Sequence, residues 1–264
     1  MEPHPHRKQS ISIAIRFGEI TRNWMSSVCL CIGLATILGP AAFAWADLET
    51  AQKAYDRGDF SSAFNEWIPM AEQGNAEAQY RVGRLYERGE GVSLEDSRAA
   101  HWYGLAAKQG HVEAQTNLGY LYATGRGVPK DRSQASRWFR SAAEKGDDFA
   151  QEQLAVLYEL GDGVQEDQVE AARWYLAAAE QGKAVSQFSL ALKYSSGRGV
   201  PKDLAQAFLW NCLAASQLGP EGDAVRESAA VNIYLLLKKM TPEELLAAQK
   251  LLKEWKPKEN TKLK

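Results

Sequence analysis

The chain repeats itself every 36 residues, and this period constrains its fold more than any other feature. Two aromatic series keep the spacing without insertion: Trp102, Trp138, Trp174 and Trp210, and Tyr86, Tyr122, Tyr158 and Tyr194. A short unit of this kind cannot bury its apolar face alone, so successive units are expected to stack into a solenoid. We predict that both aromatic series belong to the structural core of the repeats.

Each unit is predicted to contain two helices joined by a G-x-G turn. In the first unit, apolar and small residues at helical spacing run from Ala78 to Tyr86. The glycines that follow permit the left-handed conformation with which helices commonly end. Gly83 interrupts this first helix, and Gly119 does so in the second unit, although a helical glycine costs about 1 kcal/mol. We therefore expect a close approach of the partner helix at both positions.

The second helix of each unit begins with a predicted cap. Asp131, Asp167 and Asp203 are each followed three residues later by Gln or Glu, which is the spacing of a reciprocal capping box. In the first unit Glu95 holds the same position, and Asp96 is the alternative cap. Gly110, Gly146 and Gly182 are expected to end the second helices.

The period also divides the rest of the chain. Residues 223–239 are expected to form a helix, and Thr241-Pro242-Glu243-Glu244 is a strong start signal for a final one. The expected segments are a shortened N-terminal repeat or cap at 47–74, repeats at 75–110, 111–146, 147–182 and 183–218, C-terminal capping helices at 219–255 and a disordered basic tail at 256–264.

Residues 1–46 differ in kind from the repeats and are predicted to be a cleavable secretory signal. A basic stretch precedes an apolar run over residues 28–38, which is too short to span a bilayer. Ala44 and Ala46 supply the small residues of a cleavage site, and the alternative is an uncleaved anchor helix. The protein is therefore expected in the periplasm or outside the cell. Cleavage would change the formal net charge from −2 to −4 and leave Cys212 as the only cysteine.

The repeated pattern A-x-x-x-L-G-x-x-Y-x-x-G-x-G-V, then Asp, then A-x-x-W-x-x-x-A-A-x-x-G, resembles the Sel1-like repeat family, a relative of the tetratricopeptide repeats. The second unit carries it almost unaltered from Ala114 to Gly146, and the resemblance covers about residues 50–255. It implies an all-α, right-handed α-solenoid that acts as a scaffold or adaptor for a protein or peptide partner. Exported bacterial members are associated with envelope signalling, polysaccharide export and host interaction.

In related superhelices the first helix of each unit lines a concave groove. Transferred by position, the partner-binding residues are Tyr80, Arg81, Arg84, Arg88, Asn117, Tyr120, Val156, Phe188 and Leu192. This groove would run from arginine-rich to apolar, so a partner is expected to place its acidic end near Arg81 and Arg84. The alternative is that the apolar members pack against neighbouring helices and the arginines are ordinary solvated residues.

Other chemistries find little support in the sequence. His101 and His111 are read as surface positions, Cys212 as a buried inert thiol, and the G-x-G segments as turns, because they follow helices and not strands. We expect no metal, cofactor or nucleic acid, and a monomer because both ends look capped. One branch of the family is linked to β-lactamase and penicillin-binding activity, but its paired cysteines are missing here. The sequence therefore predicts a non-enzymatic adaptor, possible roles of which include regulation of an envelope signalling or assembly system.

Overall fold

In the computed structural model, residues 40–217 and 220–257 are described, and they form α-helices with no strand among them. The chain divides into two compact units, Met1–Trp67 and Ile68–Lys264. The helices are α2 (Pro40–Asp56), α3 (Phe60–Glu72), α4 (Ala76–Arg88), α5 (Asp96–Lys108), α6 (Val112–Thr124), α7 (Arg132–Ala143), α8 (Asp148–Leu160), α9 (Gln168–Glu180), α10 (Ala184–Ser196), α11 (Leu204–Ser216), α12 (Pro220–Leu237) and α13 (Pro242–Glu254).

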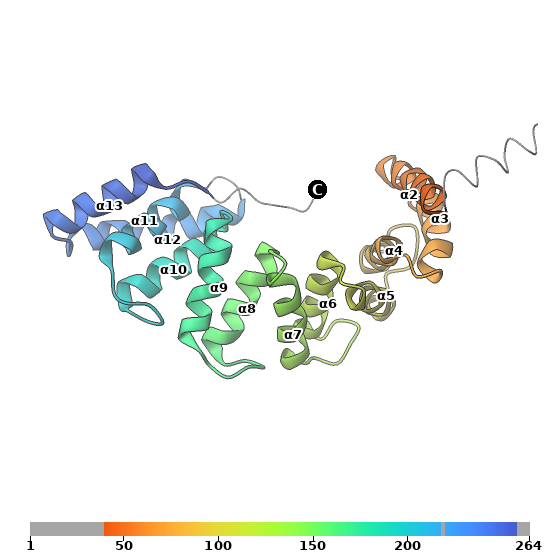
Figure 1. Cartoon of the computed structure of the whole chain (residues 1–264), viewed down its shortest axis with the longest axis horizontal. Helices are drawn as coiled ribbons and strands as arrows, with labels where there is room; N and C mark the ends of the chain where they lie inside the picture. The colour runs from red at the N-terminus through yellow and green to blue at the C-terminus, as the bar shows by residue number, and fades with distance from the viewer. Residues whose placement is uncertain (1–39, 218–219, 258–264) are drawn as a thin grey trace, which may run out of the picture. The chain divides into compact units, whose positions relative to one another are not determined.

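The second compact unit is an α-solenoid, which confirms the predicted fold class. Helices α4 to α11 form four pairs, one for each repeat, and each helix packs on the next one along the chain (Figure 1). We call the first helix of each pair the A helix (α4, α6, α8, α10) and the second the B helix (α5, α7, α9, α11). Helices α12 and α13 pack against α11 at the end of the array.

The helix boundaries follow the predicted signals, with one correction. Asp131, Asp167 and Asp203 each accept a hydrogen bond from a backbone N–H of the first helical turn. The expected reciprocal half of the box is absent from these three caps. Each cap residue instead donates its own N–H to the carbonyl of the repeat tyrosine in the A helix, for example Asp131 to Tyr122 at 2.9 Å. The cap thereby fixes the connection between the two helices of a repeat.

The first repeat shows why Asp96 is not the alternative cap. Glu95 occupies the N-cap position without a side-chain hydrogen bond. The Asp96 carboxylate accepts two hydrogen bonds from the Arg126 guanidinium of the next repeat, at 2.8 and 3.1 Å. Asp96 therefore joins two repeats.

A fully buried position lies one residue after each repeat tryptophan. Its side chains are at most 2% exposed and are Tyr103, Phe139, Tyr175 and Asn211. Of the predicted core residues, Trp174, Trp210, Tyr86 and Tyr158 are buried, whereas Trp102, Trp138, Tyr122 and Tyr194 are half-buried. In the first three repeats, the residue after the tryptophan therefore supplies the aromatic ring that fills the space between the A and B helices.

The predicted close approach at Gly83 and Gly119 is confirmed, and an aromatic ring makes it. A Cβ at Gly83 would lie 2.7 Å from the Tyr103 ring, and one at Gly119 would lie 2.9 Å from the Phe139 ring. Neither ring can withdraw easily, because both are fully buried. The mid-helix glycines therefore leave room for the core aromatics.

Two substitutions of glycine by alanine test this packing. We expect Gly119→Ala to lower the free energy of unfolding by about 1–3 kcal/mol, because it overpacks a closed core. Gly104→Ala in α5 is the matched control, since an added Cβ there meets nothing within 4 Å. It should raise stability by about 0.5–1 kcal/mol through helix propensity alone. Urea unfolding of both variants measures the difference, and equal signs would contradict the packing account.

A row of buried glutamines links each A helix to the helix before it. The side-chain amides of Gln79, Gln115, Gln151 and Gln187 each donate to a carbonyl eight residues earlier, at 3.0–3.1 Å. These carbonyls belong to the last turns of α3, α5, α7 and α9, and each also accepts the N–H of the glycine three residues later. The glutamine therefore keeps its place in every repeat because it completes the end of the preceding helix.

The ends of the chain differ in part from expectation. Helix α2 begins at Pro40 and runs through the predicted cleavage position after Ala46, whereas residues 1–39 lie outside the described part of the chain. Helix α12 begins at Pro220 and not at residue 223. The capping box of Thr241 and Glu244 is confirmed. Of the basic tail, residues 258–264 are outside the described ranges. Within those ranges, no helix has the length and apolar character needed to cross a membrane.

Candidate functional site

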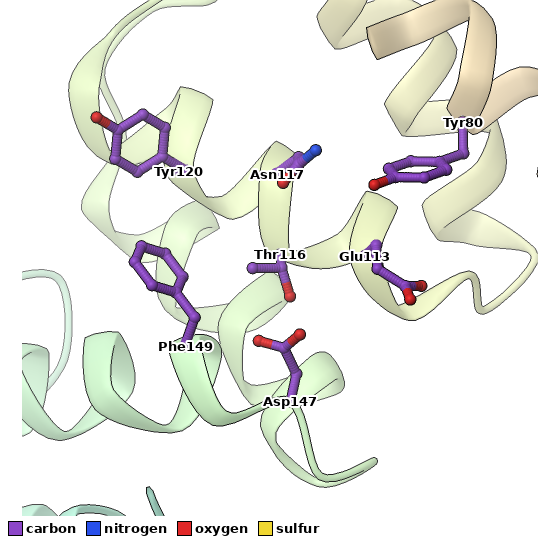
Figure 2. A pocket seen from close by; sticks show the side chains of 7 residues that line it. All are labelled: Tyr80, Glu113, Thr116, Asn117, Tyr120, Asp147 and Phe149. Carbon is purple, nitrogen blue, oxygen red and sulfur yellow. The ribbon is translucent and has the colours of Figure 1, made fainter. Parts of the chain in front are cut away.

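A pocket opens on the A helices of the second compact unit. It has a volume of about 490 Å³. Figure 2 shows the Tyr80 ring at one end and the Tyr120 and Phe149 rings at the other. We call it the A-helix pocket; its lining residues are Tyr80, Glu113, Thr116, Asn117, Tyr120, Asp147 and Phe149.

Helix α6 supplies most of the lining because of its residue spacing. Its four lining residues fall at the helical intervals that share one face, namely Glu113, Thr116, Asn117 and Tyr120. Tyr80 comes from α4, and Asp147 and Phe149 come from the start of α8. The A helices of three successive repeats therefore build one site, and no B helix contributes a lining residue.

The charged groups in the lining are both acidic. The Glu113 side chain is 62% exposed. The Asp147 carboxylate caps α8 by accepting the Ala150 N–H at 2.7 Å. Burial raises the pKa of Asp147, hydrogen bonds from the Ala150 N–H and the Thr116 hydroxyl oppose this, and the nearby charges of Asp148 and Glu113 raise it further. The pocket therefore holds negative charge that its own residues compensate only in part.

One polar group of the pocket is incompletely hydrogen-bonded. Thr116 is 7% exposed, and no donor reaches its buried hydroxyl oxygen. Figure 2 shows this hydroxyl pointing toward the Asp147 carboxylate. The hydroxyl hydrogen is therefore directed at the carboxylate, and the hydroxyl oxygen keeps an open acceptor site in the pocket wall.

The structure brings together three of the predicted groove residues, Tyr80, Asn117 and Tyr120. Arg81 lies beside them, but it is already hydrogen-bonded to Glu77 at 2.5 Å. The Arg84 guanidinium lies 5.8 Å from the centre of the Tyr80 ring. The arginines therefore flank the pocket and do not line it.

The remaining predicted groove residues lie elsewhere. Arg88 is half-exposed and 3.8 Å from Glu90. Val156 packs partly buried against the main core cluster, Phe188 is half-buried and Leu192 is 43% exposed. None of the four lines the A-helix pocket. Their role in binding stays a prediction.

Sequence reasoning missed Glu113, Asp147 and Phe149. All three lie in the first turn of an A helix or at its cap, and position-by-position transfer selected residues from the helix middle. The sequence did indicate that Asp147 is special, because an N-cap aspartate lies at the end of its helix, where it can face the preceding repeat. The distance between successive A helices, which decides whether such residues meet, is not contained in the local pattern.

His111 is not the ordinary surface residue that was expected. Its side chain is only 12% exposed. Its Nδ1 accepts the Ala114 N–H at 3.3 Å, so Nε2 carries the proton and donates to Glu77 at 3.0 Å. The Tyr80 ring stacks on the imidazole with centroids 4.5 Å apart. His111 thus caps α6 and holds Tyr80 at the pocket. His101, in contrast, is exposed as predicted.

The Glu77 contacts predict a pH dependence of stability. The hydrogen bond from His111 lowers the pKa of Glu77 from 4.5 to about 2; burial opposes the shift and Arg81 adds to it. A carboxyl whose folded pKa is depressed stabilises the fold above its unfolded pKa and loses this contribution as the pH falls. We expect the melting temperature of the wild type to exceed that of Glu77→Gln at pH 5.5, and the gap to shrink steadily toward pH 3. A gap that stays constant over this range would contradict the assignment.

The remaining candidates for chemistry are weak. Cys212 is half-buried, and burial raises the pKa of its thiol to about 11. A thiol with this pKa stays protonated at neutral pH and is a poor nucleophile. Within the described ranges, no three His, Cys, Asp or Glu side chains gather in a way that could hold a metal ion.

The helix pairs, their 36-residue period and the shared A-helix surface define a repeat solenoid of the helix–turn–helix class. The Sel1 repeat family matches residues 76–111, 112–147, 148–183 and 184–217. The chain belongs to the Sel1 repeat family. Proteins of this family typically serve as protein-interaction scaffolds, and the fold is generally non-catalytic.

One solved structure agrees with this assignment, and a second is given for comparison. A Sel1 repeat protein from Oxalobacter formigenes is 30% identical, with a TM-score of 0.66 over 78% of this chain and 85% of that one. A protective antigen of uropathogenic Escherichia coli that displays the same repeat fold is 29% identical; the match covers 79% of this chain and 52% of the antigen, with a TM-score of 0.49. No protein of curated function matches the chain.

Proposed function

We propose that this protein is an exported, monomeric scaffold that binds a segment of a protein partner along its A helices and so regulates an envelope signalling or assembly system. The observation that carries the proposal is the A-helix pocket, which three successive repeats build together. Family membership supports the general role in protein interaction. The basic, apolar and small-residue pattern of residues 1–46 supports export.

The distribution of variable residues supports binding at this surface. Several core positions keep their residue type in all four repeats, as the glutamine row does. The position of Tyr120, which is at least partly exposed in all four repeats, instead holds unlike side chains: Arg84, Tyr120, Val156 and Leu192. A surface whose side chains differ from repeat to repeat can contact different residues in successive parts of an extended or helical partner. Tyr and Arg are common anchors in such interfaces.

Cross-linking followed by capture from native cell envelopes tests the proposal. We expect the wild type to recover a defined protein partner and the double variant Tyr120→Ala/Phe188→Ala to lose most of it, about tenfold or more. The matched control is His101→Ala/Arg137→Ala, which changes two exposed B-helix residues. Circular dichroism verifies that both variants are folded. Equal recovery by the wild type and both variants would contradict binding on the A helices.

A further inference from the structure

We infer that the A-helix pocket receives the basic side chain of a lysine or arginine from the partner segment. This inference rests on the proposed function, because it specifies the chemistry by which the scaffold recognises its partner. It also adds to the expectation from sequence, which placed only acidic partner residues on this surface, near Arg81 and Arg84.

Charge is the first argument. The ionisable lining residues that are charged at neutral pH are Glu113 and Asp147, and both are acidic. Asp147 is fixed in place because it caps α8 through the Ala150 N–H. Its charge is held in a partly desolvated position, where a guest cation would offset a cost that the free protein already bears. An acidic guest would add a third negative charge to the same space.

The open acceptor site on the buried Thr116 hydroxyl is a second argument. The hydroxyl is buried in the pocket wall and directed at the Asp147 carboxylate (Figure 2). A guest N–H group drawn to the carboxylate arrives beside an oxygen that lacks a donor. Lysine and arginine carry three and five N–H donors and no acceptor, so they suit a site whose open groups are oxygens.

The aromatic walls are the third argument. The Tyr120 and Phe149 rings lie 6.4 Å apart at one end, and Tyr80 closes the other. Aromatic faces attract cations and also pack against the methylene stem of a long basic side chain. Two basic side chains of the protein itself, which do not line the pocket, already lie near these rings. The Arg81 guanidinium is 5.7 Å from the Tyr80 centroid, and the Lys183 ammonium is 5.8 Å from the Phe149 centroid.

These flanking cations would determine the direction in which the bound segment lies on the surface. Arg81 and Arg84 lie along α4 next to the pocket, so an acidic partner residue at that place and a basic one in the pocket would both meet opposite charge. Such alternation disfavours segments with the reverse order, because like charges placed together cost affinity. The pocket thus contributes specificity as well as contact area.

Titration of the purified chain with single blocked amino acids tests the inference. The probes are the N-acetyl methylamides of arginine, lysine, glutamine and glutamate, followed by amide chemical shifts in NMR spectra. We expect saturable shifts at Thr116, Asn117 and Phe149 with the arginine or lysine probe and none with glutamine or glutamate. The variant Glu113→Gln/Asp147→Asn should weaken the binding about tenfold while asparagine preserves the α8 cap.

The control Glu144→Gln/Glu227→Gln removes the same charge from exposed positions outside the pocket and should bind as the wild type does. Shifts with the glutamine or glutamate probe equal to those with arginine, no shifts with any probe, or equal binding by the pocket and control variants would each overturn the inference. The probes need no natural partner, so this failure is distinct from that of the scaffold function. If capture from envelopes depends on Tyr120 and Phe188 while no basic probe binds, the scaffold role stands and only the basic pocket is wrong.

Discussion

Replacement of Gly163 by alanine is expected to lower the free energy of unfolding by about 3 kcal/mol or more, which combines backbone strain with a steric clash. Gly163 has φ +79°, and a Cβ added there would lie 2.3 Å from the Arg132 carbonyl carbon at the start of α7. Gly127 meets Asp96 and Gly199 meets Gln168 in the same way. In the last three repeats, the second glycine of the G-x-G turn thus rests on the B helix of the previous repeat.

Gly146→Ala separates the two contributions to this loss. Gly146 also has a positive φ, +93°, but a Cβ there meets nothing within 4 Å. It should cost only the backbone strain, about 1–2 kcal/mol. Chemical unfolding of both variants gives the comparison. Equal losses would show that the turn of one repeat does not depend on close contact with the repeat before it.

Glu159→Gln is expected to destabilise the protein by about 3 kcal/mol, the lower end of the range for broken buried pairs. Its partner Lys193 is only 3% exposed and donates to Glu159 and to Gln168, both at 2.9 Å. Burial raises the pKa of Glu159, but hydrogen bonds from Lys193 and Tyr175 lower it overall. Neutralising Glu159 leaves the buried Lys193 ammonium with neutral hydrogen-bond partners only.

A second substitution should rescue this variant. The other three repeats have leucine at the position of Lys193, namely Leu85, Leu121 and Leu157, each buried. Lys193→Leu in the Glu159→Gln background removes the uncompensated charge and restores the apolar packing of the repeat. We expect the double variant to recover most of the lost stability in thermal unfolding. A double variant less stable than Glu159→Gln alone would show that the ammonium is not the source of the loss.

The sequence pattern predicted the features that depend on neighbouring residues. Helix pairs, aspartate caps and glycine ends all follow from local spacing, and so did the close approach at Gly119. Contacts between repeats could not be derived in this way. The buried glutamines kept perfect register, yet their bond to the previous helix depends on how repeats stack. Lys193 breaks the leucine series visibly, but only the structure shows that Glu159 lies within reach of it.

The same distinction between local features and contacts between repeats holds for the candidate site. Transfer from related superhelices found Tyr80, Asn117 and Tyr120, because these lie on the exposed side of each A helix. It missed Asp147 and misread His111, because both act from helix ends against the neighbouring repeat. A hydrogen bond between the two helices of a repeat also recurs. The Tyr103 hydroxyl donates to Glu87 at 2.6 Å, and the Tyr175 hydroxyl donates to Glu159 at 2.8 Å.

Site-specific photo-cross-linking in the native envelope tests the central claim, binding of a partner on the A helices, most directly. A photoreactive phenylalanine derivative replaces Tyr120 in the pocket or Arg137 on the exposed side of α7. The account predicts one discrete cross-linked product from position 120 and little or none from position 137. Equal products from both positions, or a product from 137 alone, would contradict it.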